Sequence, residues 1–307
     1  MMQSDSTEPQ EAGKPGSAFR PDPRPLAPGL YFVSTPIGAA RDITLRGLDI
    51  LAKADVLAAE DTRTLKHLME IHGVALGDRH VFAYHDHNGE AMRPKLLRAL
   101  AEGKSVAYAS EAGTPLIADP GFQLGRAAIA EGLTVLAAPG ASAVLAALTV
   151  SGLPSDRFLF AGFLPTQAGA RAKTLNDLGQ VPATLVFYES PKRIHRTLMD
   201  MVDIWGETRE AAVCRELTKR FEEVTRGALA EVAQQFEGRA VKGEIVLLVG
   251  RGGDEVPDEG RIDEALRQAL DTQSVKDAAA QVAQAFNLPK RDMYQRALAL
   301  TQKEGGA

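Results

Sequence analysis

Three short loops rich in glycine and proline carry the residues best suited to hold a nucleotide-like ligand. They lie at residues 35–38, 110–115 and 139–142, each directly after a predicted strand. In an open parallel sheet, ligands bind outside the carboxyl ends of the strands. Glycine lets a backbone approach a ligand closely, and proline stiffens the loop. One such loop alone is an ordinary turn, but three at one sheet edge favour a ligand site there.

The usual signatures of nucleotide enzymes are absent from the sequence. No G-x-G-x-x-G segment opens a helix after a strand, and no G-x-x-x-x-G-K-[ST] segment occurs. Gly250-Arg251-Gly252-Gly253 follows a predicted strand but leads into an acidic stretch. The three loops therefore point away from nicotinamide and ATP chemistry.

Histidines are concentrated in one stretch, which raises the question of a metal site. Five of the six lie close together in sequence: His67, His72, His80, His85 and His87. His85 and His87 share one face if this stretch is a strand, but no H-E-x-x-H segment is present and no cysteine joins the group. We therefore predict a polar loop that shapes a substrate pocket, and no metal site.

Asp61 and Arg63 stand where a predicted strand turns into a helix. An aspartate at this position ordinarily caps the helix, because its carboxylate accepts the first backbone N–H groups. Arg63 beside two acids also suits a clamp for a phosphate or a carboxylate. The cap is the favoured explanation, and the clamp stays open.

Two basic pairs follow predicted strands in the second half of the chain. Residues 192–193 open a helix, and a helix N-terminus attracts anions. Residues 219–220 come shortly after Glu216, at the end of another strand. Together the two pairs suit a phosphate backbone, although a solvated basic face explains either pair equally well.

The elements that must position these residues alternate between strand and helix. In the first half, strands are predicted at residues 30–33, 55–59, 105–109 and 133–137, and helices at 44–54, 61–72, 90–102, 122–131 and 141–150. In the second half, strands are predicted at 157–163, 184–188, 211–216 and 244–249, and helices at 168–178, 191–204 and 228–236. Such alternation with short connections is typical of a mostly parallel sheet covered by helices. The sequence predicts an α/β fold with two domains.

Four segments are expected along the chain. They are a disordered tail at 1–28, an α/β domain at 29–150, a second α/β domain at 155–250 and a helical appendage at 259–307. The proline-rich tail has too few large aliphatic residues to offset the entropy of ordering. In the appendage, Ser274 and Asp277 resemble a capping box. Its two helices across a tight turn fit a helix-turn-helix, but a packing appendage is favoured.

The bulk composition weighs against several classes of protein, although a local basic patch stays open. The chain has 307 residues and a net charge of −5, so it lacks the basic balance common in nucleic-acid binders. Its single cysteine, Cys214, cannot form an internal disulfide and lies in an apolar run typical of a buried thiol. No apolar stretch of about 18 residues is present, so no membrane span is predicted. A cytoplasmic location is expected.

Eight segments in this order resemble the tetrapyrrole methylase superfamily, and within it the enzymes that methylate ribose in small-subunit ribosomal RNA. The resemblance covers roughly residues 29–250. The matching segments are 30–38 with 42–44, 58–63, 85–88, 110–115 with 119–121, 139–140, 152–157, 187–190 and 215–219.

The resemblance implies a two-domain fold, a homodimer and S-adenosylmethionine bound between the domains. It implies methylation of a ribose 2′-hydroxyl on a decoding-centre cytidine of 16S rRNA, with the small ribosomal subunit as partner. The cofactor contacts carried over from the family and from the first loop fall on Pro36, Gly38, Glu111, Gly113, Thr114, Pro115, Gly140, Ala141, Ser142, Tyr188 and Glu189. The family usually has Asp at the position of Glu111 and Asn-Leu at Ala39-Ala40, so any contact at Ala39 must come from its backbone.

Methyl transfer from a sulfonium mainly requires in-line alignment of the methyl group and the 2′-oxygen, and a general base adds less. The candidate bases are His85, Asp61 and Glu216, of which histidine is the side-chain type that ordinarily titrates nearest neutral pH. The candidate RNA contacts are Arg63, Lys192, Arg193, Lys219 and Arg220. Two alternatives remain: a precorrin-type tetrapyrrole methyltransferase, and a non-catalytic RNA-binding module.

Overall fold

The computed structural model describes residues 19–117, 119–252, 259–286 and 288–304. The chain divides into two compact units, with the division inside helix α5 (Ala143–Ser151). The first unit runs to Ala146 and also includes Leu217–Arg220; the second holds Ala147–Glu216 and the chain from Phe221 onwards. The α/β class predicted from the sequence is confirmed.

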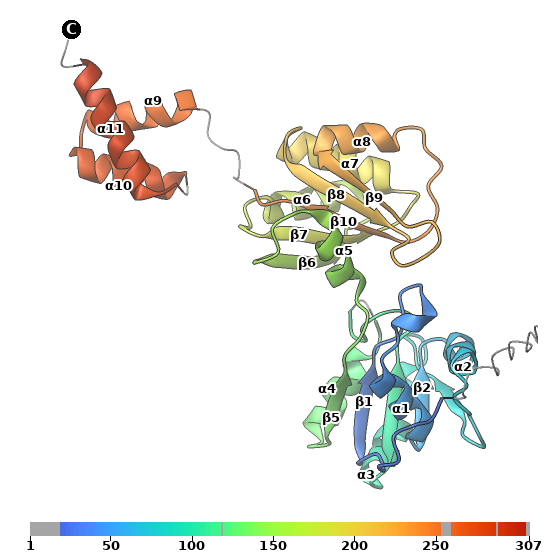
Figure 1. The fold of residues 1–307 in the computed structure, drawn as a ribbon. Helices are drawn as coiled ribbons and strands as arrows, with labels where there is room; N and C mark the ends of the chain where they lie inside the picture. Colours follow the sequence, from blue (N-terminus) through green and yellow to red (C-terminus); the bar gives the residue numbers. More distant parts are fainter. Residues whose placement is uncertain (1–18, 118, 253–258, 287, 305–307) are drawn as a thin grey trace, which may run out of the picture. The chain divides into compact units, whose positions relative to one another are not determined.

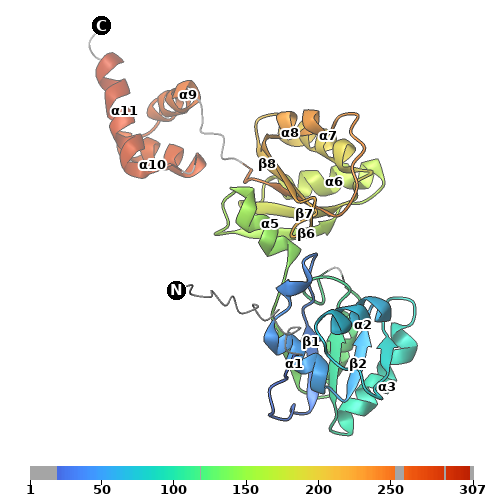
Figure 2. The same cartoon turned by 45° about the vertical axis from the view of Figure 1, so that its right-hand side comes forward.

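The first unit is built on a parallel sheet of five strands in the order β3-β2-β4-β1-β5. The strands are β1 Gly29–Val33, β2 Val56–Ala59, β3 Val81–Ala83, β4 Ser105–Ala109 and β5 Val135–Ala138. The covering helices are α1 Leu45–Lys53, α2 Thr62–Ile71, α3 Gly89–Ala101 and α4 Phe122–Ala130, with a short 3-10 turn η1 at Ala40–Asp42. Figure 2 shows the strands side by side between the helices.

Strand β1 is buried along its whole length because both faces of the sheet are covered. Tyr31 and Val33 pack with the apolar sides of α1 and α2, including Leu51 and Leu65. Leu30 and Phe32 point the other way, into a core shared with α3 and α4. The continuous apolar run in the sequence is therefore the signature of a central strand.

Residues 19–28 precede β1 and make contacts with α1. The Asp22 backbone N–H donates to the Asp49 carboxylate at 2.8 Å, and Lys53 donates to the carbonyls of Asp22 and Arg24. Phe19 and Leu26 pack against the core beneath α1. The rest of the predicted disordered tail, residues 1–18, lies outside the described residues.

The second unit has a mixed sheet in the order β6-β7-β10-β8-β9. Only β6 and β7 run parallel, and the other neighbours are antiparallel. The strands are β6 Phe158–Phe163, β7 Thr184–Glu189, β8 Glu210–Arg215, β9 Glu223–Ala228 and β10 Ile245–Val249. Helices α6 Ala168–Gly179, α7 Ile194–Trp205 and α8 Leu229–Phe236 cover one face, and α5 lies against the other (Figure 1).

A separate group of three helices ends the described chain: α9 Glu259–Leu270, α10 Val275–Ala285 and α11 Lys290–Glu304. Its buried side chains all come from these helices, among them Leu266, Val282 and Ala297. The predicted cap is confirmed, since the Asp277 backbone N–H donates to the Ser274 hydroxyl at 3.2 Å. Most of the predicted linker at 251–258 lies outside the described residues.

Three short or late elements were missed in the sequence: β3, β9 and α9. Strand β3 lies inside the histidine-rich stretch, where three residues pair with Leu57–Ala59 of β2. Cys214 is buried, as expected, and its thiol approaches the Ala147 carbonyl at 3.9 Å. In the described part of the chain, no helix has the length and apolar character needed to cross a membrane.

Candidate functional site

The three glycine- and proline-rich loops come together in the first unit because β4, β1 and β5 are neighbours in its sheet. Thr35 and Gly113 exchange two backbone hydrogen bonds of 3.0 Å, which tie the loop after β1 to the loop after β4. The Thr114 hydroxyl donates to the Ala141 carbonyl at 2.9 Å, which ties in the loop after β5. The loops therefore form one continuous edge.

Gly113 is required at the centre of this edge. Its φ of +82° lies in the left-handed region that side chains disfavour. A β-carbon there would lie 3.2 Å from the Ile37 side chain. The Ser110 hydroxyl donates to the Gly113 carbonyl at 2.5 Å, so the turn is held from both ends. Without a side chain at Gly113, the backbone of this turn is left open to a ligand.

The segment Leu217–Arg220, which follows β8 in sequence, packs against the loop after β1. The Ala39 backbone N–H donates to the Thr218 hydroxyl at 3.0 Å. A β-carbon on Gly38 would lie only 2.5 Å from the Lys219 side chain and 2.6 Å from the Thr218 hydroxyl. Gly38 is therefore needed for this close approach, and Ala39 contributes through its backbone.

An acidic group lies beside these loops, at the carboxyl ends of β2 and β4. The Tyr108 hydroxyl and the Gly121 backbone N–H donate to Asp119 Oδ1 at 2.9 and 2.7 Å. Asp119 Oδ2 is buried, and no described residue hydrogen-bonds it. Burial raises the pKa of Asp119, and burial together with the nearby Asp119 charge raises the pKa of Glu60. This edge therefore favours a cation or a hydrogen-bond donor.

Asp61 is the N-cap of α2, as favoured from the sequence. Its Oδ1 accepts from the backbone N–H groups of Arg63 and Thr64 at 2.7 and 3.4 Å. Its Oδ2 accepts from the Arg63 guanidinium at 2.8 Å. The Arg63 bonds lower the pKa of Asp61 to about 2. The carboxylate is thus a poor proton acceptor at neutral pH, and the Arg63 guanidinium already has one anionic partner.

His85 lies directly after β3 and Tyr84, with its backbone held by Asn88. The His85 N–H donates to the Asn88 side-chain oxygen at 2.9 Å, while the Asn88 amide donates to the Ala83 carbonyl. His85 Nδ1 is buried without a hydrogen-bond partner among the described residues. The rings of His85 and His87 lie 6.0 Å apart. In the described ranges, no three His, Cys, Asp or Glu side chains are grouped to hold a metal ion.

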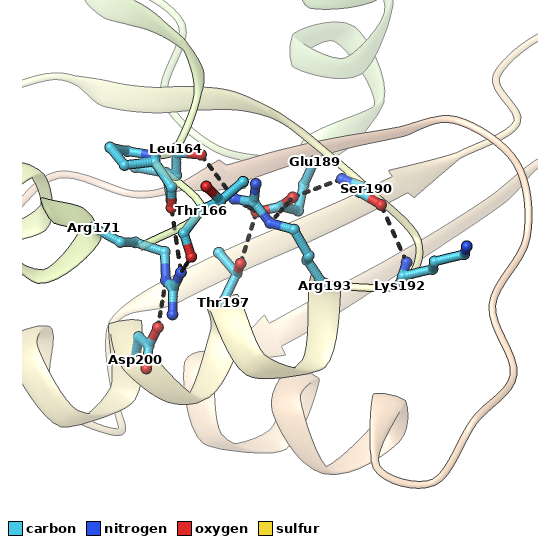
Figure 3. Close-up of polar contacts among 10 residues, drawn as sticks. Leu164, Thr166, Arg171, Glu189, Ser190, Lys192, Arg193, Thr197 and Asp200 are labelled. Carbon is cyan, nitrogen blue, oxygen red and sulfur yellow. Dashed lines mark hydrogen bonds and ion pairs between the residues drawn. The ribbon is translucent and has the colours of Figure 1, made fainter. Parts of the chain in front are cut away.

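Glu189 and Arg193 form a buried pair at the end of β7 (Figure 3). Glu189 is 3% exposed and accepts hydrogen bonds from the Ser190 backbone N–H and the Thr197 hydroxyl at 2.6 and 2.7 Å. The Arg193 Nε lies 3.1 Å from Glu189 Oε1, and its Nη2 donates to the Leu164 carbonyl at 2.8 Å. Glu189 can therefore offer a ligand only its backbone, and Arg193 has internal partners.

The remaining predicted contacts lie at the ends of β7 and β8. Lys192 is exposed, and its side chain extends away from the Glu189–Arg193 pair (Figure 3). Glu216 has a φ of +51°, and its carboxylate accepts from the Glu244 backbone N–H at 3.0 Å. Lys219 is half-buried and Arg220 is exposed. Glu216 thus has a structural contact, and the exposed Lys192 and Arg220 suit a charged partner.

Comparison with known sequences and structures identifies the class of protein to which this fold and loop edge belong. The family model described as Tetrapyrrole (Corrin/Porphyrin) Methylases matches residues 29–233. The chain belongs to this family. Cobalt precorrin-4 methyltransferase has the same fold, with a TM-score of 0.55 at 20% identity over 72% of this chain and 94% of that chain. Uroporphyrin-III C-methyl transferase from Thermus thermophilus, solved with S-adenosyl homocysteine, gives a TM-score of 0.51 at 21% identity, covering 72% and 97%.

Much more similar relatives place the chain in one branch of that family. Ribosomal RNA small subunit methyltransferase I from Mesorhizobium japonicum is 46% identical, covering 92% of this chain and 95% of the relative. The protein of the same name from Escherichia coli O157:H7 is 40% identical, covering 88% and 94%. A second family model, the RsmI C-terminal HTH domain, matches residues 256–301. The branch is therefore that of the ribosomal RNA small subunit methyltransferases I.

Proposed function

We propose that the chain transfers a methyl group from S-adenosylmethionine to the ribose 2′-hydroxyl of a decoding-centre cytidine in 16S rRNA. The observation that supports this most strongly is the 40–46% identity to relatives of that branch over nearly the whole chain. The joined loops after β1, β4 and β5 support it independently, because they offer a ligand edge made of backbone groups.

The residues at this edge fit a positively charged cofactor. S-adenosylmethionine supplies an activated methyl group on a cationic sulfur. The acidic group of Glu60 and Asp119 favours a positive charge nearby. The buried Asp119 Oδ2, which no described residue hydrogen-bonds, offers an acceptor to a donor group. We propose backbone contacts to the cofactor from residues 36–38, 111–115 and 140–142 of this edge. For residues 188–189, which the resemblance also names, we propose contacts through the backbone alone, since the Glu189 carboxylate is already engaged.

Among the candidate bases, the geometry favours His85. The Asp61 carboxylate is occupied by its cap and by Arg63, and Glu216 accepts from a backbone N–H. His85 Nδ1 is buried and lacks a partner within the described part of the chain, so it has a lone pair or a proton to offer. His85→Ala is expected to lower the single-turnover rate about 10²–10⁴-fold, the usual contribution of general acid–base catalysis. Asp61→Asn, which keeps a cap, is the matched control; equal rates in both variants would remove His85 as the base.

The cytidine 2′-O-methylation is tested by mass spectrometry of rRNA nucleosides. A strain in which the gene is deleted should lose one 2′-O-methylcytidine from its 16S rRNA, and the wild-type gene should restore it. Gly113→Val, which places a branched side chain in a left-handed turn against Ile37, should fail to restore it. An unchanged nucleoside profile, or transfer to precorrins instead of ribosomal subunits, would refute the assignment.

The resemblance further suggests a homodimer that acts in the cytoplasm. Sedimentation of the purified chain at micromolar concentration tests the dimer directly, since a dimer should sediment near twice the 32.8 kDa chain mass. A single species at the chain mass would exclude it.

A further inference from the structure

Strand β6 carries an irregularity that brings two of its aromatic rings against one ring of β7. Phe160 pairs in register with Val186, but the next paired residue is Gly162, opposite Phe187. Gly162 has a φ of +68°, which marks a bulge at this step. In a regular strand, Phe160 and Phe163 would point to opposite faces. The bulge re-aims Phe163 toward the face that carries Phe160.

The result is a cluster of three rings, which we call the aromatic platform: Phe160, Phe163 and Tyr188. The Tyr188 ring centroid lies 4.8 Å from that of Phe160 and 5.6 Å from that of Phe163. The interplanar angles are 65° and 62°, so the rings meet edge to face. Phe163 is nevertheless 59% exposed. A ring that is fixed by a neighbour yet open to solvent is suited to stack on a flat partner.

The loop that follows Phe163 is held by two arginines (Figure 3). Arg193 donates to the Leu164 carbonyl at 2.8 Å, and Arg171 donates to the carbonyls of Pro165 and Thr166 at 3.2 and 2.9 Å. Three successive carbonyls are thus bound from inside the unit. Arg171 is 2% exposed and its Nε lies 2.5 Å from the Asp200 carboxylate. This arginine clamp fixes the backbone next to the platform.

Exposed positive charge follows the platform in sequence. Lys192 follows the end of β7 by three residues, and Arg196 lies in the first turn of α7; each is exposed. Aromatic rings that stack on bases, combined with cations that contact phosphates, are the usual means of holding single-stranded nucleic acid. The same bulge argues against a second copy adding a strand at the β6 edge, since bulges hinder edge-to-edge pairing.

We propose that Phe163, supported by Tyr188 and Phe160, stacks on a base of the RNA substrate next to the nucleotide that is methylated or elsewhere in the same single-stranded segment. The proposal rests on RNA being the substrate. Phe163 lies outside the glycine- and proline-rich loops and outside both basic pairs. The backbone of residues 188–189 stays available to the cofactor, because the platform uses only the Tyr188 ring.

The test measures methyl transfer to small ribosomal subunits isolated from the deletion strain. Phe163→Leu, which removes the ring but keeps an apolar side chain, should raise KM for subunits about 5- to 150-fold, the equivalent of ~1–3 kcal/mol for one stacked base. Phe163→Trp should retain the wild-type KM. Phe158→Leu is the matched control, because Phe158 is also exposed on β6, at 42%, and is not part of the platform. Its KM should not change.

Three outcomes would overturn the proposal. The first is an equal KM for Phe163→Leu and Phe158→Leu. The second is a parallel loss of S-adenosylmethionine affinity in calorimetry, which would mean that Phe163 stacks on the adenine of the cofactor. The third is a change in sedimentation for Phe163→Leu, which would place the ring between two copies of the chain. If the wild-type chain itself does not methylate subunits, the proposed function has failed. This result differs from failure of the stacking proposal, in which the wild-type chain and the Phe158→Leu control remain active.

Discussion

Glu60 and Asp61 are neighbours in the sequence, yet their carboxylates have opposite environments. Asp61 turns to the start of α2, where two backbone N–H groups and Arg63 stabilise its negative charge. Glu60 faces Asp119, Glu111 and Asp86, and burial further disfavours its charge. The raised pKa of Glu60 therefore marks this residue as part of the acidic group beside the loops.

The first prediction concerns the cap. Asp61→Ala should lower the free energy of unfolding by about 1 kcal/mol, because the first N–H groups of α2 lose their acceptor. Asp61→Asn should cost less, since asparagine caps about as well as aspartate. Urea unfolding followed by circular dichroism measures the difference. Equal losses in the two variants would show that the charge pair with Arg63, and not the cap, carries the effect.

The second prediction concerns pH. The folded-state pKa of Glu60 is raised, so the folded chain binds a proton at this carboxylate more tightly than the unfolded chain does. The ionised carboxylate thus destabilises the fold above its folded pKa, and the penalty disappears as pH falls below the unfolded value near 4.5. Glu60→Gln should raise the melting temperature at neutral pH, with a gain that vanishes toward pH 4. A gain that persists at pH 4 would point to packing and not to charge.

At this scale the sequence identified residue types better than their partners. The cap at Asp61 and the buried Cys214 followed from position alone, because local backbone and an apolar run determine them. Glu189 and Arg193 were predicted to face ligands, whereas the structure pairs them with each other. Their i, i+4 spacing on the turn into α7 is a usable signal for such a pair. The hydrogen bond from Arg193 to the Leu164 carbonyl forms because β6 lies beside β7. That pairing is tertiary structure, which the local sequence does not encode.

At the scale of elements, α6 and α7 are joined by the buried Arg171–Asp200 pair. Breaking it leaves charge and carbonyl groups without partners, so Arg171→Met should lower the free energy of unfolding by about 3 kcal/mol, near the low end for buried pairs because Asp200 is 30% exposed. Lys173→Met on the same helix is the matched control. Lys173 and Asp177 are mostly exposed, so its loss should fall within about 0.5 kcal/mol. Denaturant midpoints compare the two variants, and similar losses would contradict a stabilising role for the clamp.

The long elements followed from the sequence, and the short ones did not. Periodic helices such as α2 and α7 have clear apolar faces. Their ends lie within three residues of the predicted ones. Strand β3 has only three residues and β9 has exposed positions, so neither offers a run or alternation strong enough to recognise. The antiparallel order of the second sheet depends on long-range pairing, which a local pattern does not encode.

At the scale of the whole chain, the three C-terminal helices have their own core. A chain that stops after Gly252 should therefore keep the circular dichroism per residue of the two sheet-bearing units and their melting temperature. The buried side chains of Ile262, Leu266 and Met293 belong to that core. Thermal unfolding of the truncated chain beside the full-length chain is the measurement. A large drop in melting temperature would mean that the helical group stabilises the rest.

The membership of Leu217–Arg220 in the first unit has a consequence for synthesis. Ala146 and Arg220 are 74 residues apart, so the first unit cannot complete itself until much of the second has been translated. At a synthesis rate of about 5 to 20 residues per second, this is a delay of about 4 to 15 s. During that interval the nascent loop after β1 lacks the Thr218 hydroxyl that later accepts from Ala39. The edge formed by the three loops is then completed only after translation has passed the β8–β9 turn, which makes its maturation a late event in the life of the nascent chain.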